Sequence, residues 1–164
     1  MIERAAALVL LAGAAFAGMF QQESKPAAAV SYPRDYRNWA HVKTALIGPS
    51  SPFFATVGGL HHIYANDKAK EGYASGRFPD GSVLVFDVLE ARESEGTTVE
   101  GPRRLIDVME KDSQRFAATG GWGFAEFKGD NQTEQSLTAE AAKKCHSCHA
   151  TAQNHDLVFS KFRR

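Results

Sequence analysis

Short runs of alternating apolar and polar residues, separated by glycine and proline, make up much of the chain. The segment 39–47 alternates imperfectly and ends at turn residues, and GGLHHIYAN (58–66) follows it as a second short run, so each predicts a β-strand. Within the second segment, His62 and Tyr64 are expected on one face of the strand and His61 on the other.

The run VLVFDVL, residues 83–89, is the strongest strand signal, because β-branched and aromatic residues follow a P-D-G turn and leave no polar face. LIDVMEKD (105–112) mixes helical and strand periods, and its place between two turn-rich stretches favours a strand. WGFAEFK (122–128) alternates between glycine turns. The polar stretch ESEGTTVEGP (93–102) predicts a loop. The short connections leave no room for crossover helices, so about five mostly antiparallel strands are expected.

Two helices are predicted. A short one over 68–74 has Asn66 or Asp67 as its N-cap, and one over 139–150 has Thr138 as its N-cap. The expected fold class is therefore α+β, a mainly antiparallel β-sheet with a few helices, the last of them at the C-terminus.

The N-terminus reads as a secretory signal peptide over residues 1–17. Arg4 precedes an apolar run, and Ala15-Phe16-Ala17 has the small-x-small pattern of a signal-peptidase site. A retained membrane anchor is the alternative, but a span needs about 20 apolar residues, and this run is followed by the polar QQESKP. We expect an exported, periplasmic protein with no membrane span after cleavage, a flexible tether over 18–31, and a single domain over 32–164.

Charge gives little information about partners. The 164 residues include 19 Lys and Arg and 19 Asp and Glu, so no overall field attracts nucleic acid or an anionic membrane. No nucleic-acid partner is expected.

The two cysteines of the chain carry the chemistry. In the sequence KKCHSCHATA, Cys145, Cys148 and His149 stand at i, i+3 and i+4 of the last predicted helix, so they project from one face. Two thiols can add to the vinyl groups of a porphyrin, and the following imidazole can then bind its iron. The motif predicts covalently attached haem c with His149 as axial iron ligand, which agrees with export.

Two other uses of these residues are weaker. A thioredoxin-type dithiol needs the cysteines at the start of a helix after a strand, whereas this pair lies late in a helix. A zinc site would need a fourth ligand, and His146 or His155 offers one only at an unusual spacing.

The residue on the other side of the iron decides between functions. Met109, His41, His61 or His62 as sixth ligand would make an electron carrier, whereas an open or apolar position would bind a small gas or a substrate. A histidine on a strand is, however, more often a hydrogen-bonded structural residue.

Phenylalanine is abundant, with eleven residues. Phe53, Phe54 and Phe78 lie in turn-rich stretches, where they are candidates to cover a haem face. An apolar pocket offers no donor to stabilise partly anionic bound dioxygen, so a nearly neutral diatomic such as nitric oxide is relatively favoured.

Four stretches together resemble the cytochrome P-460 family, which includes the cytochromes c-prime-beta: GGLHHIYAN, SGRFPDGSVLVFDVLEA, VMEKDSQRFAATGGWGFAEF and KKCHSCHATAQNHDLVFSKF. The resemblance covers about Tyr32 to Phe162. It implies a mainly antiparallel β-sheet subunit, often a homodimer, with one haem c whose proximal ligand matches His149.

In the family members that oxidise hydroxylamine, a lysine before the segment matching SGRFPDG is cross-linked to the porphyrin. Here Tyr73 and Ala74 stand before Ser75, and Lys70 is a helical turn earlier. The relatives without the cross-link have a five-coordinate haem with a hydrophobic distal face that binds nitric oxide or carbon monoxide.

We therefore expect a haem c protein that binds nitric oxide or a similar diatomic gas for sensing, scavenging or detoxification. The alternatives are an enzyme that oxidises hydroxylamine or nitric oxide, and a simple electron carrier with a redox partner protein.

Overall fold

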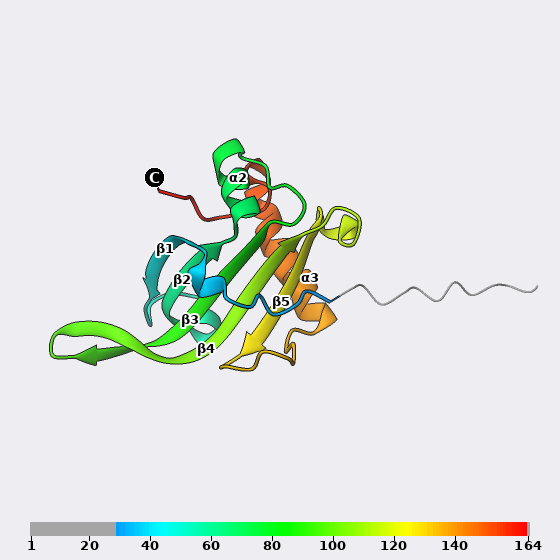
Figure 1. The fold of residues 1–164 in the computed structure, drawn as a ribbon. Coiled ribbons are helices and arrows are strands. Elements are labelled where there is room, and N and C mark those ends of the chain that lie inside the picture. The colour runs from blue at the N-terminus through cyan, green and yellow to red at the C-terminus, as the bar shows by residue number, and fades with distance from the viewer. Residues whose placement is uncertain (1–28, 164) are drawn as a thin grey trace, which may run out of the picture.

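The computed structural model describes residues 29–163, so the predicted signal peptide and most of the predicted tether lie outside the described residues. A single five-stranded sheet forms the body of the fold (Figure 1). Its strands are β1 (Ala40–Ile47), β2 (Gly59–Ala65), β3 (Val83–Ser94), β4 (Thr97–Lys111) and β5 (Trp122–Lys128). Each strand pairs antiparallel with its neighbour in the sequence, which confirms the predicted α+β class.

The described helices are α1 (Phe54–Val57), α2 (Asp67–Ser75) and α3 (Ala139–His149), with 3₁₀ turns at Tyr36–Asn38, Ala117–Thr119 and Ala150–His155. Of the two candidate caps for α2, Asn66 is the one that acts, because its side chain accepts a hydrogen bond from the amide of Ala69. Thr138 caps α3 in the same way, by accepting from the amide of Ala141. Both predicted helices are confirmed, and α1 is an addition.

Both faces of the sheet are covered. On one face, which we call the helix face, Leu84, Trp122 and Phe124 pack with residues of α2 and of the C-terminal segment. On the other, the N-terminal face, Val85 and Ile106 pack under the segment that precedes β1. The prediction that 83–89 is buried on both sides is confirmed. The prediction that His61 lies on one face of its strand and His62 and Tyr64 on the other is confirmed as well.

A buried carboxylate fastens the N-terminal segment to the sheet. Asp87 is fully buried on the N-terminal face and accepts hydrogen bonds from Tyr36 Oη at 2.6 Å, Arg37 Nη2 at 2.9 Å and Arg103 Nε at 2.8 Å. Burial by itself would raise the pKa of Asp87, but these donors outweigh it and the pKa is lowered. Arg103 also pairs with the exposed carboxylate of Asp130.

The predicted loop over 93–102 is wrong. β3 and β4 continue beyond the rest of the sheet as a two-stranded arm (Figure 1) and turn only at Glu95 and Gly96, which have φ angles of 51° and 77°. Two successive positive φ angles give a turn whose twist matches that of paired strands. Nearly all residues of the arm are exposed in the part of the chain that the structure describes, and they are mostly polar, so the arm lacks the alternation that marks a half-buried strand.

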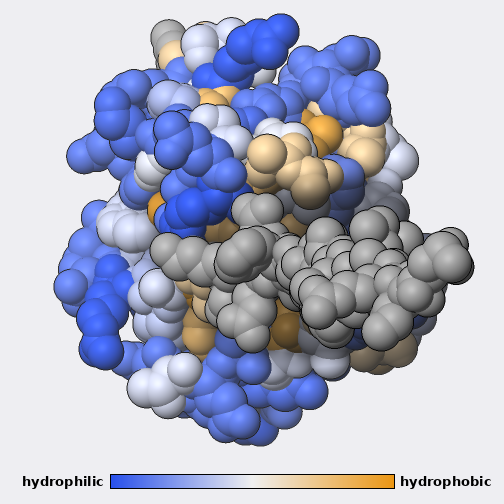
Figure 2. All heavy atoms as spheres, turned by 90° about the vertical axis from the view of Figure 1, so that its right-hand side faces the viewer, coloured by the Kyte–Doolittle hydropathy of each residue, from blue (hydrophilic) through white to orange (hydrophobic). Residues whose placement is uncertain are grey.

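Hydrophilic side chains dominate the face of the molecule shown in Figure 2, and apolar ones gather in smaller areas between them. Among the described residues, no helix is long and apolar enough to cross a membrane.

Candidate haem-attachment site

The attachment motif lies on α3, which packs against β5 on the helix face (Figure 1). Cys145 is partly buried, Cys148 is exposed, and both are free thiols. The helix extends from its Thr138 cap through an alanine- and lysine-rich body to His149, and helical spacing brings the two thiols and the imidazole to one side.

The orientation of the His149 ring is fixed by a backbone carbonyl. Nδ1 lies 2.8 Å from the carbonyl oxygen of Leu157, so it carries the hydrogen and leaves the lone pair of Nε2 for a metal. The ring centroids of Phe124 and Phe159 lie 5.5 and 4.9 Å from that of His149. Burial among these groups lowers the pKa of His149, which favours the neutral form that can bind iron.

The position of the Leu157 carbonyl is fixed through the preceding residue, Asp156, which is hydrogen-bonded to three other parts of the chain. The Asp156 carboxylate accepts from the amide of Phe78 at 2.8 Å and from Lys111 Nζ at 2.7 Å, and the Asp156 carbonyl accepts from Trp122 Nε1 at 2.8 Å. Both Asp156 and Leu157 have positive φ angles, 50° and 65°, which non-glycine residues adopt only when their surroundings hold them. This junction ties the segment after α2 to the end of α3.

Two carboxylates face the attachment helix from the sheet. Asp107 on β4 and Glu126 on β5 are directly opposite each other in the register, and both act on the thiol of Cys145. Burial, and then the Glu126 carboxylate, raise the pKa of Asp107 to about 7. Burial, and then these two carboxylates, also raise the pKa of Cys145.

The residues present fit a covalently attached haem. Two unpaired thiols and an imidazole with a free Nε2 occupy one side of a helix, and a metal ligand whose other nitrogen is hydrogen-bonded is the usual arrangement. Among residues 29–163, no cluster of three or more His, Cys, Asp or Glu side chains is placed to hold a bare metal ion, so the structure gives the zinc alternative no fourth ligand.

The phenylalanines predicted to cover the haem lie in different places. Phe53 and Phe54 are exposed on and beside α1, at 59% and 40% of their surface. Phe78 is buried in the core, with ring centroids 5.0 Å from Tyr73 and 5.5 Å from Trp122. The structure does not bring the three together around His149, and contact of any of them with haem stays a prediction.

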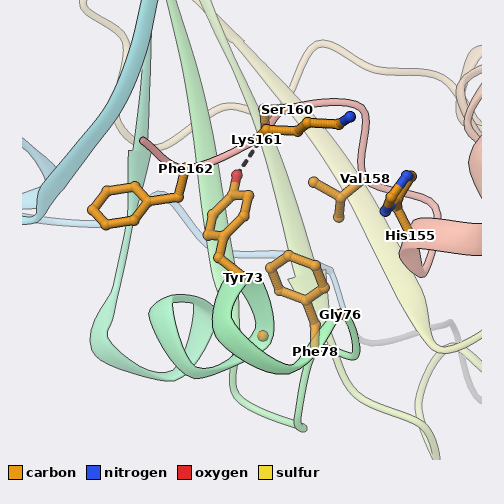
Figure 3. Close-up of a pocket in the computed structure, with 9 residues that line it drawn as sticks. Tyr73, Gly76, Phe78, His155, Val158, Ser160, Lys161 and Phe162 are labelled. Carbon is orange, nitrogen blue, oxygen red and sulfur yellow. Dashed lines mark hydrogen bonds between the residues drawn. The ribbon is translucent and has the colours of Figure 1, made fainter. Parts of the chain in front are cut away.

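Phe78 also lines a pocket of about 260 Å³ between α2 and the C-terminal segment (Figure 3). Tyr73 and Phe162 form one side of it and His155 lies at the opposite side, with the Tyr73 hydroxyl 2.6 Å from Ser160 Oγ. None of Cys145, Cys148 and His149 lines this pocket.

The other candidate iron ligands are distributed over both faces. Met109 packs on the helix face opposite Phe124, and His61 is buried on the same face against Phe86, at a centroid distance of 4.4 Å. His41 and His62 lie on the N-terminal face, away from α3. Burial, followed by repulsion from Lys43, lowers the pKa of His61 to about 4.

Lys70 projects into solvent from α2. Its side chain is 46% exposed and its Nζ lies 3.0 Å from the Asp67 carboxylate. Tyr73, one turn later, faces the core.

Several residues of the site were not predicted from the sequence. The partly exposed ring of Phe124 lies beside that of His149, with the ring centroids 5.5 Å apart. Glu126 lies two residues after Phe124, so both side chains are on the same face of the strand. This spacing could have identified Glu126 from the sequence. The role of the Leu157 carbonyl had no sequence signal, because a backbone acceptor depends only on conformation.

A protein-family model described as Cytochrome P460 matches residues 33–160. No curated protein matches the chain.

Proposed function

Because this chain belongs to the cytochrome P460 family of haem cytochromes, we propose that it is an exported c-type cytochrome whose haem iron binds nitric oxide or a similar small diatomic gas. The proposed role is sensing, scavenging or detoxification. The observation that carries the proposal is the placement of His149, which is oriented for metal binding between apolar rings.

The residues that would hold the haem lie on α3. The Sγ atoms of Cys145 and Cys148 would form the two thioether bonds, and Nε2 of His149 would bind the iron. When bound, haem supplies an iron centre that takes one small ligand at its open axial position and exchanges one electron. The Leu157 carbonyl orients the imidazole and makes it a more basic ligand, and burial favours the neutral form of the ring.

Apolar side chains lie on the helix face beside the motif, next to the carboxylates of Asp107 and Glu126. Phe124 and Met109 are paired across β5 and β4, and the partly exposed Phe86 lies on the same face of β3. Apolar side chains bind a neutral diatomic without supplying the donor that anionic dioxygen needs, which supports a nitric oxide or carbon monoxide ligand.

The position of Lys70 supports a gas-binding protein over a lysine-cross-linked enzyme. Its ion pair with Asp67 and its exposure leave it on the solvent side of α2. Nothing in the described contacts of Lys70 directs it toward the attachment helix.

An absorption spectrum of the reduced protein, produced with a haem-attachment system, tests the proposal. A five-coordinate, high-spin ferrous spectrum that shifts on addition of carbon monoxide or nitric oxide is expected. A six-coordinate, low-spin spectrum without added ligand would refute it. Met109→Ala and His61→Ala would then show which side chain fills the sixth position.

Asp107 favours hydroxylamine oxidation as the second candidate. Oxidising hydroxylamine releases protons, and a carboxyl group with a pKa of about 7 beside Cys145 can accept one near neutral pH. Mass spectrometry of the haem peptide discriminates the candidates. A third covalent link, through lysine, supports the enzyme, whereas two thioether links alone support the gas-binding protein.

A further inference from the structure

A pair of histidines on the N-terminal face, opposite to α3, has geometry that the haem chemistry does not use. His41 on β1 and His62 on β2 have their ring centroids 5.8 Å apart. Nε2 of His41 and Nδ1 of His62 each lie 2.8 Å from the same atom, Oγ1 of Thr44. Two imidazole nitrogens therefore point to one place.

A β-bulge creates this arrangement. His41 pairs with Tyr64 and Lys43 with Ile63, so Val42 is an extra residue in β1. Without the bulge, His41 and Thr44 would lie on opposite faces, because side chains alternate along a strand. With it, the two imidazoles and the hydroxyl share one face, and Val42 is buried in the core on the other side.

The hydroxyl of Thr44 can bridge the two imidazoles by donating to one ring nitrogen and accepting from the other. One hydroxyl has one hydrogen, so only one of the two ring nitrogens can accept it and the other must donate. Each imidazole is thus restricted to one tautomer. The ring that accepts from Thr44 carries its hydrogen on the other nitrogen, and the ring that donates to Thr44 has a lone pair on the other nitrogen.

Glu100 resembles the outer partner of a metal ligand. Its Oε1 lies 2.7 Å from Nε2 of His62, but off the direction of a well-aligned hydrogen bond. A carboxylate in this place favours the tautomer with hydrogen on Nε2, which leaves the lone pair of Nδ1 directed at the His41 side. Carboxylate, histidine and metal commonly follow one another in this order.

We propose that His41 Nε2 and His62 Nδ1 form a binding site for a divalent transition metal ion such as Zn²⁺, with Glu100 as the outer carboxylate. Two imidazoles on one tetrahedral ion place their ring centroids about 5 Å apart, close to the 5.8 Å observed, and the ion would take the place of the Thr44 hydroxyl between the two nitrogens. His41 is exposed and the His62 side chain is 14% exposed, so water can complete the coordination.

The charges around the pair do not oppose a cation. Asp87 lies directly opposite His62 in the register, and Arg37 and Arg103 are paired with Asp87. Glu100 adds a further negative charge beside His62.

Titration calorimetry with Zn²⁺ on the haem-loaded protein tests the site. The holoprotein is used so that the thiols of Cys145 and Cys148 are not free to react with Zn²⁺. One Zn²⁺ per chain is expected, with binding weakened roughly tenfold or more by His41→Ala and by His62→Ala, and about tenfold by Glu100→Gln. His155→Ala, an exposed histidine elsewhere, is the matched control and should bind as the wild type does.

Thr44→Ala separates a metal site from a structural hydrogen-bond chain. It removes both hydrogen bonds but neither ligand, so zinc binding should persist. Zinc binding that is unchanged in His41→Ala and His62→Ala, or absent from the wild type, overturns the proposal. If His62→Ala does not fold, anomalous diffraction from zinc-soaked wild-type crystals decides, since the ion must lie between the two imidazoles.

Discussion

The buried carboxylate of Asp87 allows a quantitative test of how the N-terminal segment is held. Asp87→Asn preserves the shape of the side chain but removes its charge, which leaves Arg103, 15% exposed, without its buried partner. Breaking a buried ion pair by removing one member costs about 3–5 kcal/mol of the free energy of unfolding. Arg37 is 46% exposed and Arg103 retains Asp130, so the lower end, about 3 kcal/mol, is expected.

Urea denaturation followed by circular dichroism measures this loss, and thermal unfolding should show a decrease in Tm of roughly 10 °C. Asp130→Asn is the matched control, because its carboxylate pairs with the same arginine but is 81% exposed. An exposed pair contributes at most about 1 kcal/mol, so the control should stay close to the wild type.

The pH dependence provides a second check. The pKa of Asp87 in the folded protein lies below the unfolded value of about 3.9. Its contribution is therefore complete above that pH and is lost as the pH falls through the folded-state pKa. Equal stability of Asp87→Asn and Asp130→Asn at pH 7, or a difference that does not shrink in strong acid, would refute the reasoning.

Three further predictions concern other parts of the molecule. Asn66→Ala removes the cap of α2 and should lower the free energy of unfolding by about 1–2 kcal/mol in urea titrations, and no change would contradict the capping role. Gly72→Ala places a Cβ atom 2.3 Å from the Phe78 ring and should cost about 1–3 kcal/mol by the same assay, unless the ring moves freely. Because the folded-state pKa of Asp107 is raised to about 7, the stability of the wild type relative to Asp107→Asn should fall as the pH rises from about 4 to about 7; parallel profiles would contradict this.

The sequence predicts the strands whose side chains have a regular burial pattern, with either one face or both faces buried. β2 and β5 alternate, and the run 83–89 is apolar throughout because the sheet is covered on both faces. The arm of β3 and β4 was not predicted, since main-chain pairing and contacts such as Thr98 Oγ1 to Glu93 hold it together without apolar burial. Short-range patterns do not record such pairing.

The residues of the site can likewise be separated into those that the sequence places together and those that it does not. The placement of Cys145, Cys148 and His149 on one side of α3 follows from local helical spacing, so the sequence is sufficient to place them together. Asp107 and Glu126 come to face Cys145 only through the register of β4 with β5 and the docking of α3. The bulge at Val42, which joins His41 to His62, likewise depends on how two strands align.

The simple order of the strands has a consequence for the way the molecule is assembled. Every strand pairs with the one made just before it, so each hairpin can close locally as the chain emerges. The sheet is complete at Lys128, before either cysteine has appeared. The helix that carries Cys145, Cys148 and His149 is thus added last, onto a sheet that is already complete.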